Sequence, residues 1–283
     1  MAVRAVESWR SALATLALRS VRVADRAFSY REAGTGEPMV FLHGISSGSG
    51  SWVHQLIHFE SSARCVSWDA PGYGTSSALT NPWPSASDYE RALASFLDAL
   101  KIESSLIVAH SLGAIMATAF AARHPDRVRG MVLLDPAIGY GALPREEASA
   151  RLDSRLSQLK DLGIEGLART RASALVSDRA GQEAIGLIRW NMMRLSPDGY
   201  TQAARMLAAS NLLKDAKFFK SRVFVACGTE DRITPEESCR QVALAFAQGQ
   251  YLGLQGLGHA SYIEAPPVVN ERIAEFYMGT QND

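Results

Sequence analysis

Short runs of apolar, often β-branched residues alternate along the chain with longer stretches whose apolar residues recur every three to four positions. The short runs have the length of strands and the longer stretches fit amphipathic helices. The runs that predict strands are 27–34, 39–44, 64–70, 106–110, 131–136, 222–228 and 250–256. A helix is predicted over 88–100 from one apolar face. Strands that alternate with helices predict an α/β fold with a mostly parallel, doubly wound sheet flanked by helices.

This alternation stops between residues 137 and 217, where only helical periodicity is present. Two apolar stripes have that period: Leu152, Leu156 and Leu159, and then Ile185, Ile188, Met192 and Leu195. A further helix is predicted to begin after Ser196, with Pro197 at its first position. We therefore expect a core of 1–136 and 218–283, and an all-helical cap of 137–217 inserted between two strands. Ligands of open α/β sheets bind beyond the carboxyl ends of the strands, so this cap should roof a binding site.

Charge and cysteine content narrow the possible partners. The 29 basic and 29 acidic residues cancel, so we expect no nucleic acid partner and no anionic membrane surface. No apolar run reaches the length of a membrane span. The cysteines Cys65, Cys227 and Cys239 have no CxxC spacing, which predicts reduced thiols and a cytoplasmic protein. A small-molecule substrate, no cofactor, and a monomer or homodimer are expected.

The N-terminal segment 1–26 contains several arginines but only one acidic residue before Asp25. This composition has a weak similarity to a transit peptide. Its apolar stretch is short and is interrupted by Arg19, which argues against a secretory signal. We predict a surface helix that precedes the domain.

A serine stands where an apolar strand gives way to an alanine-rich helix. Ser111 follows LIVAH and precedes LGAIMATAF, with Ala109 and Gly113 two positions to either side. These small residues allow a sharp turn, and the following helix directs its N-terminal N–H groups toward whatever Ser111 attacks. A nucleophilic serine also needs a base, and the base needs an orienting carboxylate. Asp231 and His259 each lie in a loop that follows a predicted strand.

Residues 109–113 resemble the nucleophile elbow of α/β-hydrolases, whose pattern is G-x-S-x-G, with alanine in place of the first glycine. Residues 69–76, DAPGYGTS, resemble the D-x-x-G-x-G-x-S loop of the same family. The chain order Ser, Asp, His is also the order of this fold. The resemblance covers nearly the whole chain. It implies a catalytic triad of Ser111 as nucleophile, His259 as base and Asp231 as orienting acid.

The same resemblance implies an oxyanion hole made by two backbone N–H groups, those of Leu112 and Ile45. His43 is expected to hold the shape of the loop that contains Ile45. Asp135, which closes MVLLDP, is an alternative orienting acid, because some members of this fold place the acid after that earlier strand.

Several other residues are weaker candidates. His54 and His58 have a spacing that could chelate a metal, but the glutamate of H-E-x-x-H is missing, so we expect no metal site. Substrate contacts are expected from Trp52, Arg189, Trp190 and Met193. Arg189 could pair with a substrate carboxylate, although helix arginines are by default solvated surface charges.

The serine excludes the family members that use aspartate at the elbow, haloalkane dehalogenases and epoxide hydrolases. The ending GHASYIEAP lacks the tryptophan that usually follows the histidine in hydrolases of ring-cleavage products, and RLSPDGYTQAARML is in the style of enol-lactonases. The resemblance therefore favours hydrolysis of a carboxylic ester or lactone. Hydrolysis of the C–C bond of a vinylogous diketone is the alternative, and a receptor or acyltransferase stays open.

Overall fold

A single sheet forms the centre of the computed structural model, which describes residues 8–280. Its strands are β1 (Arg19–Val23), β2 (Arg26–Ala33), β3 (Pro38–Leu42), β4 (Arg64–Trp68), β5 (Ser105–His110), β6 (Val128–Leu134), β7 (Val223–Gly228) and β8 (Gly249–Leu254). They lie in the order β1-β2-β4-β3-β5-β6-β7-β8. Neighbours from β4 to β8 run parallel, and β2 is antiparallel to both of its neighbours. The predicted mostly parallel sheet is confirmed.

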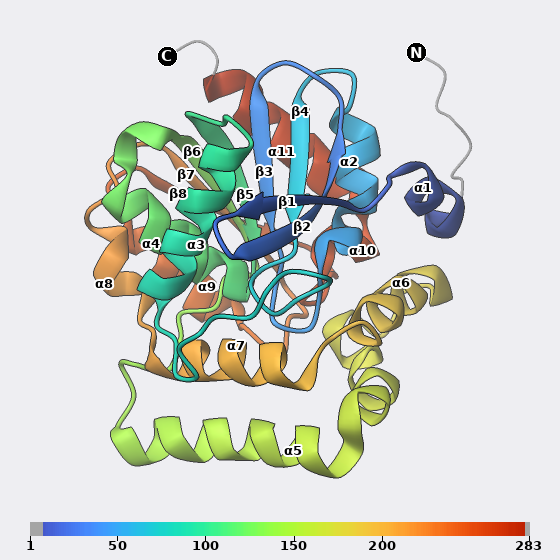
Figure 1. Ribbon diagram of the computed structural model, residues 1–283, viewed down its shortest axis with the longest axis vertical. Coiled ribbons are helices and arrows are strands. Elements are labelled where there is room, and N and C mark those ends of the chain that lie inside the picture. Colours follow the sequence, from blue (N-terminus) through green and yellow to red (C-terminus); the bar gives the residue numbers. More distant parts are fainter. Residues whose placement is uncertain (1–7, 281–283) are drawn as a thin grey trace.

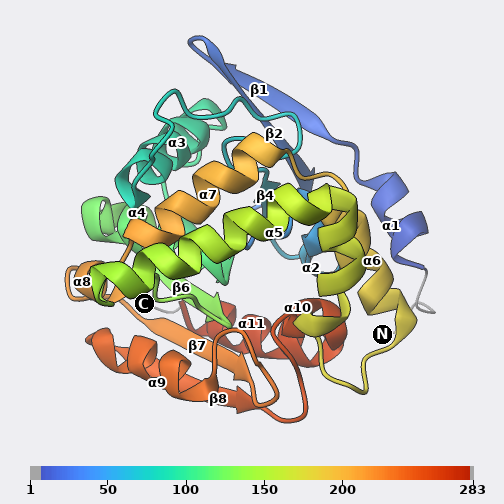
Figure 2. The same cartoon turned by 90° about the horizontal axis from the view of Figure 1, so that it is seen from below.

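Helices cover both faces of this sheet (Figures 1 and 2). The helices are α1 (Trp9–Thr15), α2 (Val53–Phe59), α3 (Ala86–Ala99), α4 (Leu112–Arg123), α5 (Arg145–Arg171), α6 (Gln182–Met192), α7 (Pro197–Ala209), α8 (Leu212–Ala216), α9 (Glu236–Ala245), α10 (Ser261–Glu264) and α11 (Pro266–Thr280). The row α3, α4, α8 and α9 lies on one face, and α2 and α11 lie together on the other. Every residue of β5 is buried, as expected for a central strand covered on both faces.

The N-terminal segment differs from the predicted surface helix. A helix is present only over Trp9–Thr15, and Arg19–Val23 forms an edge strand paired with β2. In this short strand only Val21 and Val23 alternate with polar residues, which is too little to predict a strand from sequence. Trp9 is buried, so α1 packs on the domain. Residues 1–7 of the predicted segment lie outside the described residues.

The stretch between β6 and β7 contains α5 to α8 and no strand among the described residues. Helices α5 and α7 lie side by side across the carboxyl edge of the sheet (Figures 1 and 2). Gly163, at φ 61° and ψ −178°, interrupts the helical backbone of α5. Glycine adopts such a positive φ without the penalty that other residues pay, so α5 changes direction there.

Polar contacts fix α7 to the rest of the domain. As predicted, Ser196 is the N-cap of α7, and its Oγ accepts from the N–H of Gly199 at 2.9 Å. The same hydroxyl donates to the carbonyl of Gly72 at 2.9 Å. Further along α7, the Gln202 side chain donates to the carbonyl of Leu79 at 2.7 Å and accepts from its N–H at 3.2 Å. The position of α7 above the sheet is therefore set by hydrogen bonds as well as by apolar packing.

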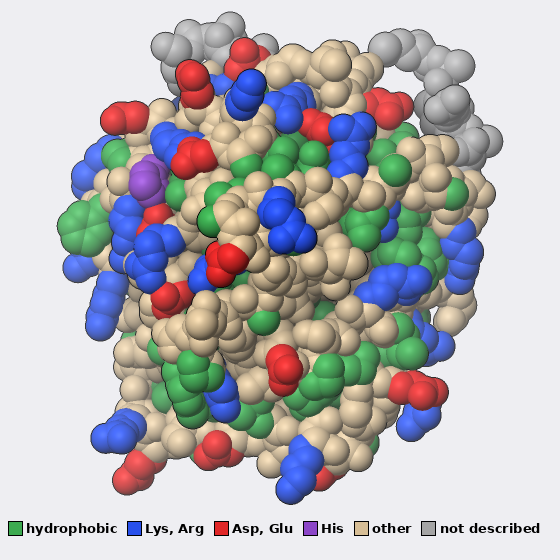
Figure 3. All heavy atoms as spheres, viewed as in Figure 1, with side chains coloured by type: hydrophobic (Ala, Val, Ile, Leu, Met, Phe, Trp, Pro, Cys, Tyr) green, Lys and Arg blue, Asp and Glu red, His purple; other side chains and the backbone are tan. Residues whose placement is uncertain are grey.

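Acidic and basic side chains are interspersed on the face of the molecule that Figure 3 shows. This agrees with the equal numbers of acidic and basic residues in the sequence. Among residues 8–280, no helix has both the length and the apolar character needed to cross a membrane.

Candidate active site

Ser111 occupies a strained turn between β5 and α4. Its φ of 51° and ψ of −115° are unusual for a residue other than glycine, and such conformations cost on the order of 1–3 kcal/mol. The turn is held by the N–H of Ser111, which donates to the carbonyl of Leu134 at 3.0 Å. A Cβ on Gly113 would lie 2.4 Å from the carbonyl oxygen of Leu42, so glycine is required there. Ala109 is fully buried, so its methyl group is accommodated where the family pattern has glycine.

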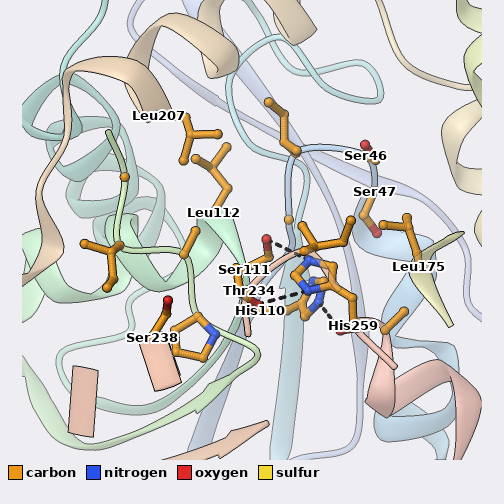
Figure 4. A pocket seen from close by; sticks show the side chains of 18 of the residues that line it. Ser46, Ser47, His110, Ser111, Leu112, Leu175, Leu207, Thr234, Ser238 and His259 are labelled. Atoms are coloured by element: carbon orange, nitrogen blue, oxygen red, sulfur yellow. Dashed lines mark hydrogen bonds between the residues drawn. The ribbon is translucent and has the colours of Figure 1, made fainter. Parts of the chain in front are cut away.

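The three predicted triad side chains form a continuous chain of hydrogen bonds. Nε2 of His259 lies 3.0 Å from Oγ of Ser111 (Figure 4), and Nδ1 lies 2.8 Å from Oδ2 of Asp231. The other carboxylate oxygen of Asp231 accepts from the N–H groups of Ile233 and Thr234, at 2.7 and 3.0 Å. The carboxylate is thus fixed in position from both sides, and all three side chains are buried.

The pKa shifts follow from this arrangement. Burial alone would lower the pKa of His259, but the charge and hydrogen bond of Asp231 outweigh it and raise that pKa above its usual value. Burial alone would raise the pKa of Asp231, and the charge and hydrogen bond of His259 together with bonds from Thr234 lower it. The pair therefore favours an ionised carboxylate beside an imidazole whose Nδ1–H points at it.

Asp135, the alternative acid, bonds elsewhere. Its carboxylate accepts from the N–H of Gly228 at 2.8 Å and from the hydroxyl of Ser261 at 2.6 Å. None of its hydrogen bonds in the described structure goes to His259. Burial and the nearby charge of Asp231 raise the pKa of Asp135 to about 7, so its ionisation is opposed near neutral pH.

Asp135, Cys227 and Asp231 form the one cluster of three possible metal ligands among residues 8–280, with the ligand atoms within 4.8 Å of one another. Asp231 is already bonded to the triad histidine. A hydrogen bond with Cys239 and burial raise the pKa of Cys227, whereas a metal ligand must be a thiolate. These residues therefore do not suit a cation. The structure places no third ligand beside the His54 and His58 pair in its described part.

The two predicted oxyanion donors lie beside Ser111. Ile45 and Leu112 both line the cavity into which the serine opens. Leu112 is the first residue of α4, so its N–H has no helical acceptor. His43 accepts from the N–H of Ala70 at 3.0 Å and donates to the carbonyl of Gly44 at 2.8 Å. It thus joins the loop after β3 to the loop after β4, in agreement with the structural role predicted for it.

Two further residues contact the triad and were not predicted. His110 donates from Nε2 to the carbonyl of His259 at 2.9 Å (Figure 4). Burial is the main cause that lowers the pKa of His110 to about 3. Thr234 donates its hydroxyl to Asp231 at 2.6 Å. The only sequence feature that could have predicted these two residues is that they lie close to Ser111 and Asp231 in the sequence. That feature is weak evidence, since neighbours in sequence often point away from a site.

A cavity of about 410 Å³ opens above Ser111 and His259. Much of its wall is apolar and comes from the segment between β6 and β7. Figure 4 shows Leu112, Leu175 and Leu207 lining it around the serine. Three arginines of α5 complete the wall: Arg151, Arg155 and Arg171. The arrangement joins the predicted nucleophile, base and oxyanion donors to a space of the size that small organic ligands occupy.

The structure does not place the four predicted substrate contacts on the cavity wall. These are Trp52, Arg189, Trp190 and Met193. The ring of Trp190 packs on the ring of Trp9, 5.8 Å between centroids, and the guanidinium of Arg194 lies 3.6 Å above it. The ring of Trp190 therefore packs between α1 and the side chain of Arg194, which follows α6. Trp52 is fully buried and stacks at 4.2 Å on Tyr262, which does line the cavity.

The other two predicted contacts face solvent. Arg189 is exposed on α6, and Met193 at the end of that helix is 46% exposed. Contrary to the prediction, Arg189 is not placed to bind a carboxylate in the cavity, because the face of α6 that carries it points away from the cavity. The cavity does contain arginines, but they come from α5.

Comparison with known proteins agrees with this fold. Residues 37–266 match the α/β hydrolase fold family, to which the chain belongs. It is 25% identical over 249 residues to the (E)-2-((N-methylformamido)methylene)succinate hydrolase of Acinetobacter baylyi, with 87% of this chain and 92% of that one covered.

Among solved structures, the chain is similar to the enol-lactonase from Burkholderia xenovorans, with a TM-score of 0.83, 21% identity and coverage of 92% and 100%. An esterase from Thermogutta terrifontis is similar to the same degree, with a TM-score of 0.83, 21% identity and coverage of 93% and 99%. At this level of identity the two likenesses show a shared fold. The three similar proteins are a hydrolase, an enol-lactonase and an esterase by their names.

Proposed function

We propose that the protein is a serine hydrolase that cleaves a carboxylic ester or lactone of a small molecule through an acyl-enzyme on Ser111. The observation that carries this proposal is the unbroken series of hydrogen bonds from Asp231 through His259 to Ser111, at the floor of a partly apolar cavity. A structural serine needs no such partners, whereas a nucleophilic one does.

In the proposed reaction, Nε2 of His259 takes the proton of the Ser111 hydroxyl as Oγ bonds to the substrate carbonyl carbon. The carbonyl oxygen becomes an oxyanion, which the N–H groups of Ile45 and Leu112 stabilise. His259 then gives the proton to the leaving oxygen as the C–O bond breaks. Water activated by the same base releases the acid and regenerates the serine. Asp231 keeps Nδ1–H of His259 pointed at itself and offsets the positive charge that develops on the ring.

Residues 137–217 are proposed to act as the cap that closes this site. Helices α5 and α7 lie over the carboxyl edge of the sheet, and α7 is hydrogen-bonded to the loops below it. A cap in this place excludes water from the oxyanion and supplies contacts to the body of the substrate. The ester or lactone assignment rests on the serine at the elbow and on the sequence of the histidine loop and of the cap, and the fold shared with an enol-lactonase and an esterase is compatible with it.

The test is a panel of p-nitrophenyl esters, lactones and vinylogous diketones, assayed with wild type and with Ser111→Ala. Ser238→Ala is the matched control, since Ser238 also lines the cavity but has no histidine bonded to its hydroxyl. A fluorophosphonate should phosphonylate wild type and Ser238→Ala with loss of fluoride, and should leave Ser111→Ala unlabelled. Turnover of diketones without turnover of esters and lactones would favour C–C hydrolysis. Labelling of Ser111→Ala would contradict the proposed nucleophile.

A further inference from the structure

The wall of the cavity that α5 forms is cationic. Arg151, Arg155 and Arg171 all line the same cavity as Ser111 and His259. They also line a shallow surface hollow along α5. The arginines therefore lie between the cavity and solvent, at the side of the cavity that the cap provides. This location raises the question of what balances their charge.

Arg155 has no anionic partner among residues 8–280. It donates to two phenol oxygens, that of Tyr200 at 3.3 Å and that of Tyr140 at 3.2 Å. Its Nε is buried and makes no hydrogen bond in the described structure. Neutral phenols orient a guanidinium but do not neutralise it. Arg155 is half-buried, and holding a charge partly out of water without a counter-ion is costly, so this arrangement suits a site that receives its anion from outside.

Arg171 also has no anionic partner among residues 8–280. Its side chain donates to Oε1 of Gln158 at 3.1 Å, and no carboxylate of the described residues pairs with it. Arg155 and Arg171 line both the cavity and the surface hollow, and burial together with the positive charge of Arg155 lowers the pKa of Arg171. By contrast, Arg151 is paired with Glu147 at 2.7 Å on the same helix. The uncompensated charge of the cavity is therefore that of Arg155 and Arg171.

The cationic wall lies within electrostatic reach of the chemistry. Arg155 and His259 line the same cavity, and the positive charge of Arg155 is a minor cause that opposes the net rise in the pKa of His259. Apolar side chains such as Leu143 and Leu207 line the same cavity as the arginines and Ser111. A ligand that fills this space would present a carbonyl group to Ser111, apolar atoms to the leucines and a negative group to the arginines.

We infer that the substrate is an acid: it carries a carboxylate remote from the scissile carbonyl, and Arg155 and Arg171 bind that carboxylate. The inference rests on the proposed function and specifies its substrate class as acid-bearing esters or lactones, such as half-esters of dicarboxylic acids. Guanidinium groups suit this role because they form paired, charge-assisted hydrogen bonds with a carboxylate. These two residues take the place of Arg189 in the hypothesis of an anionic substrate.

The first experiment compares kcat/KM for matched ester pairs. Mono-p-nitrophenyl succinate, glutarate and adipate are each paired with a neutral p-nitrophenyl ester of the same chain length. Wild type should prefer at least one acid over its neutral partner. Arg155→Met and Arg171→Met should each reduce the acid-to-neutral ratio about 10- to 100-fold, the range expected for a lost hydrogen bond to a charged group. Arg155→Lys, which keeps the charge, should retain part of the preference.

Arg169→Met is the matched control, because Arg169 is an exposed arginine of the same helix that does not line the cavity. It should leave the ratio unchanged. An equal loss of kcat/KM for acid and neutral esters in Arg155→Met would contradict a carboxylate-binding role for Arg155. Its role would then be to connect α5 to the two tyrosines. Turnover of neutral esters that depends on Ser111, with no preference for any acid, would overturn the inference and leave the proposed function standing.

A binding measurement separates the two proposals further. Calorimetric titration of Ser111→Ala with monomethyl adipate and with neutral dimethyl adipate needs no turnover. Tighter binding of the half-ester, lost in Ser111→Ala/Arg155→Met, would support the carboxylate site even if every activity assay failed. Equal binding of the two esters would overturn it.

Discussion

Exchanging each of the two buried carboxylates for an amide tests the triad most sharply. In Asp231→Asn, the amide oxygen can still accept from the N–H groups of Ile233 and Thr234, which now bond to Oδ1. The NH₂ group then replaces Oδ2, which faces Nδ1 of His259 at 2.8 Å. It can only donate there, so the ring is driven to the tautomer that carries its proton on Nε2. That nitrogen can no longer accept the proton of Ser111.

The expected loss in kcat is on the order of 10⁴-fold, as in other triads that lose the orienting carboxylate. This equals about 5 kcal/mol of transition-state stabilisation. Asp135→Asn is the matched control. Its amide oxygen can accept from the N–H of Gly228, and the Ser261 hydroxyl, now 2.6 Å from Oδ2, can rotate to accept from the new NH₂ group. We expect less than about a tenfold loss.

The assay is kcat/KM for the best ester of the panel, with circular dichroism to establish that both variants fold. A greater loss in Asp135→Asn than in Asp231→Asn would refute the assignment of the orienting acid. The pH profile gives a second readout. The charge that Asp135 gains as it ionises near pH 7 is among the causes that raise the pKa of His259, so Asp135→Asn should shift the acidic limb of the profile slightly to lower pH.

The remaining predictions are independent of that pair. Ser111→Ala should lower kcat about 10⁴- to 10⁶-fold with the fold intact, and an acyl adduct seen by mass spectrometry in the variant would contradict this. Because the pKa of His259 is raised above about 6.5, kcat/KM should rise with pH through about pH 6 to 8, and a profile falling over that range would oppose a neutral histidine base. Asp135 keeps its proton in the folded state up to about pH 7, so its contribution to stability should fall as pH rises from about 4 to 7; thermal melts of Asp135→Asn should lack this contribution when compared with wild type. A chelator should not inhibit, and inhibition reversed by a divalent ion would reopen the role of His54 and His58.

The sequence determined the fold class and the set of side chains at the centre of the site. Parallel strands place their carboxyl ends at one edge of a sheet, so the residues that follow β5, β7 and β8 had to lie near one another. Ser111, Asp231 and His259 were predictable for this reason. The choice of Asp231 over Asp135 came from the motif, and the hydrogen bonds of the structure agree with it.

Only the tertiary structure decided which neighbour each face of a helix meets. Periodicity finds the apolar stripe of α6, but it does not reveal that α1 packs against Trp190 and that Arg189 is left in solvent. The same limit hid Arg155 and Arg171, which are 16 residues apart on α5 with the interruption at Gly163 between them. Whether Arg155 and Arg171 meet at one cavity depends on how α5 turns at Gly163 and on which elements α5 packs against. That packing consists of contacts between residues far apart in the sequence. The charges of the cavity wall are therefore a property of the folded chain that the local sequence pattern does not contain.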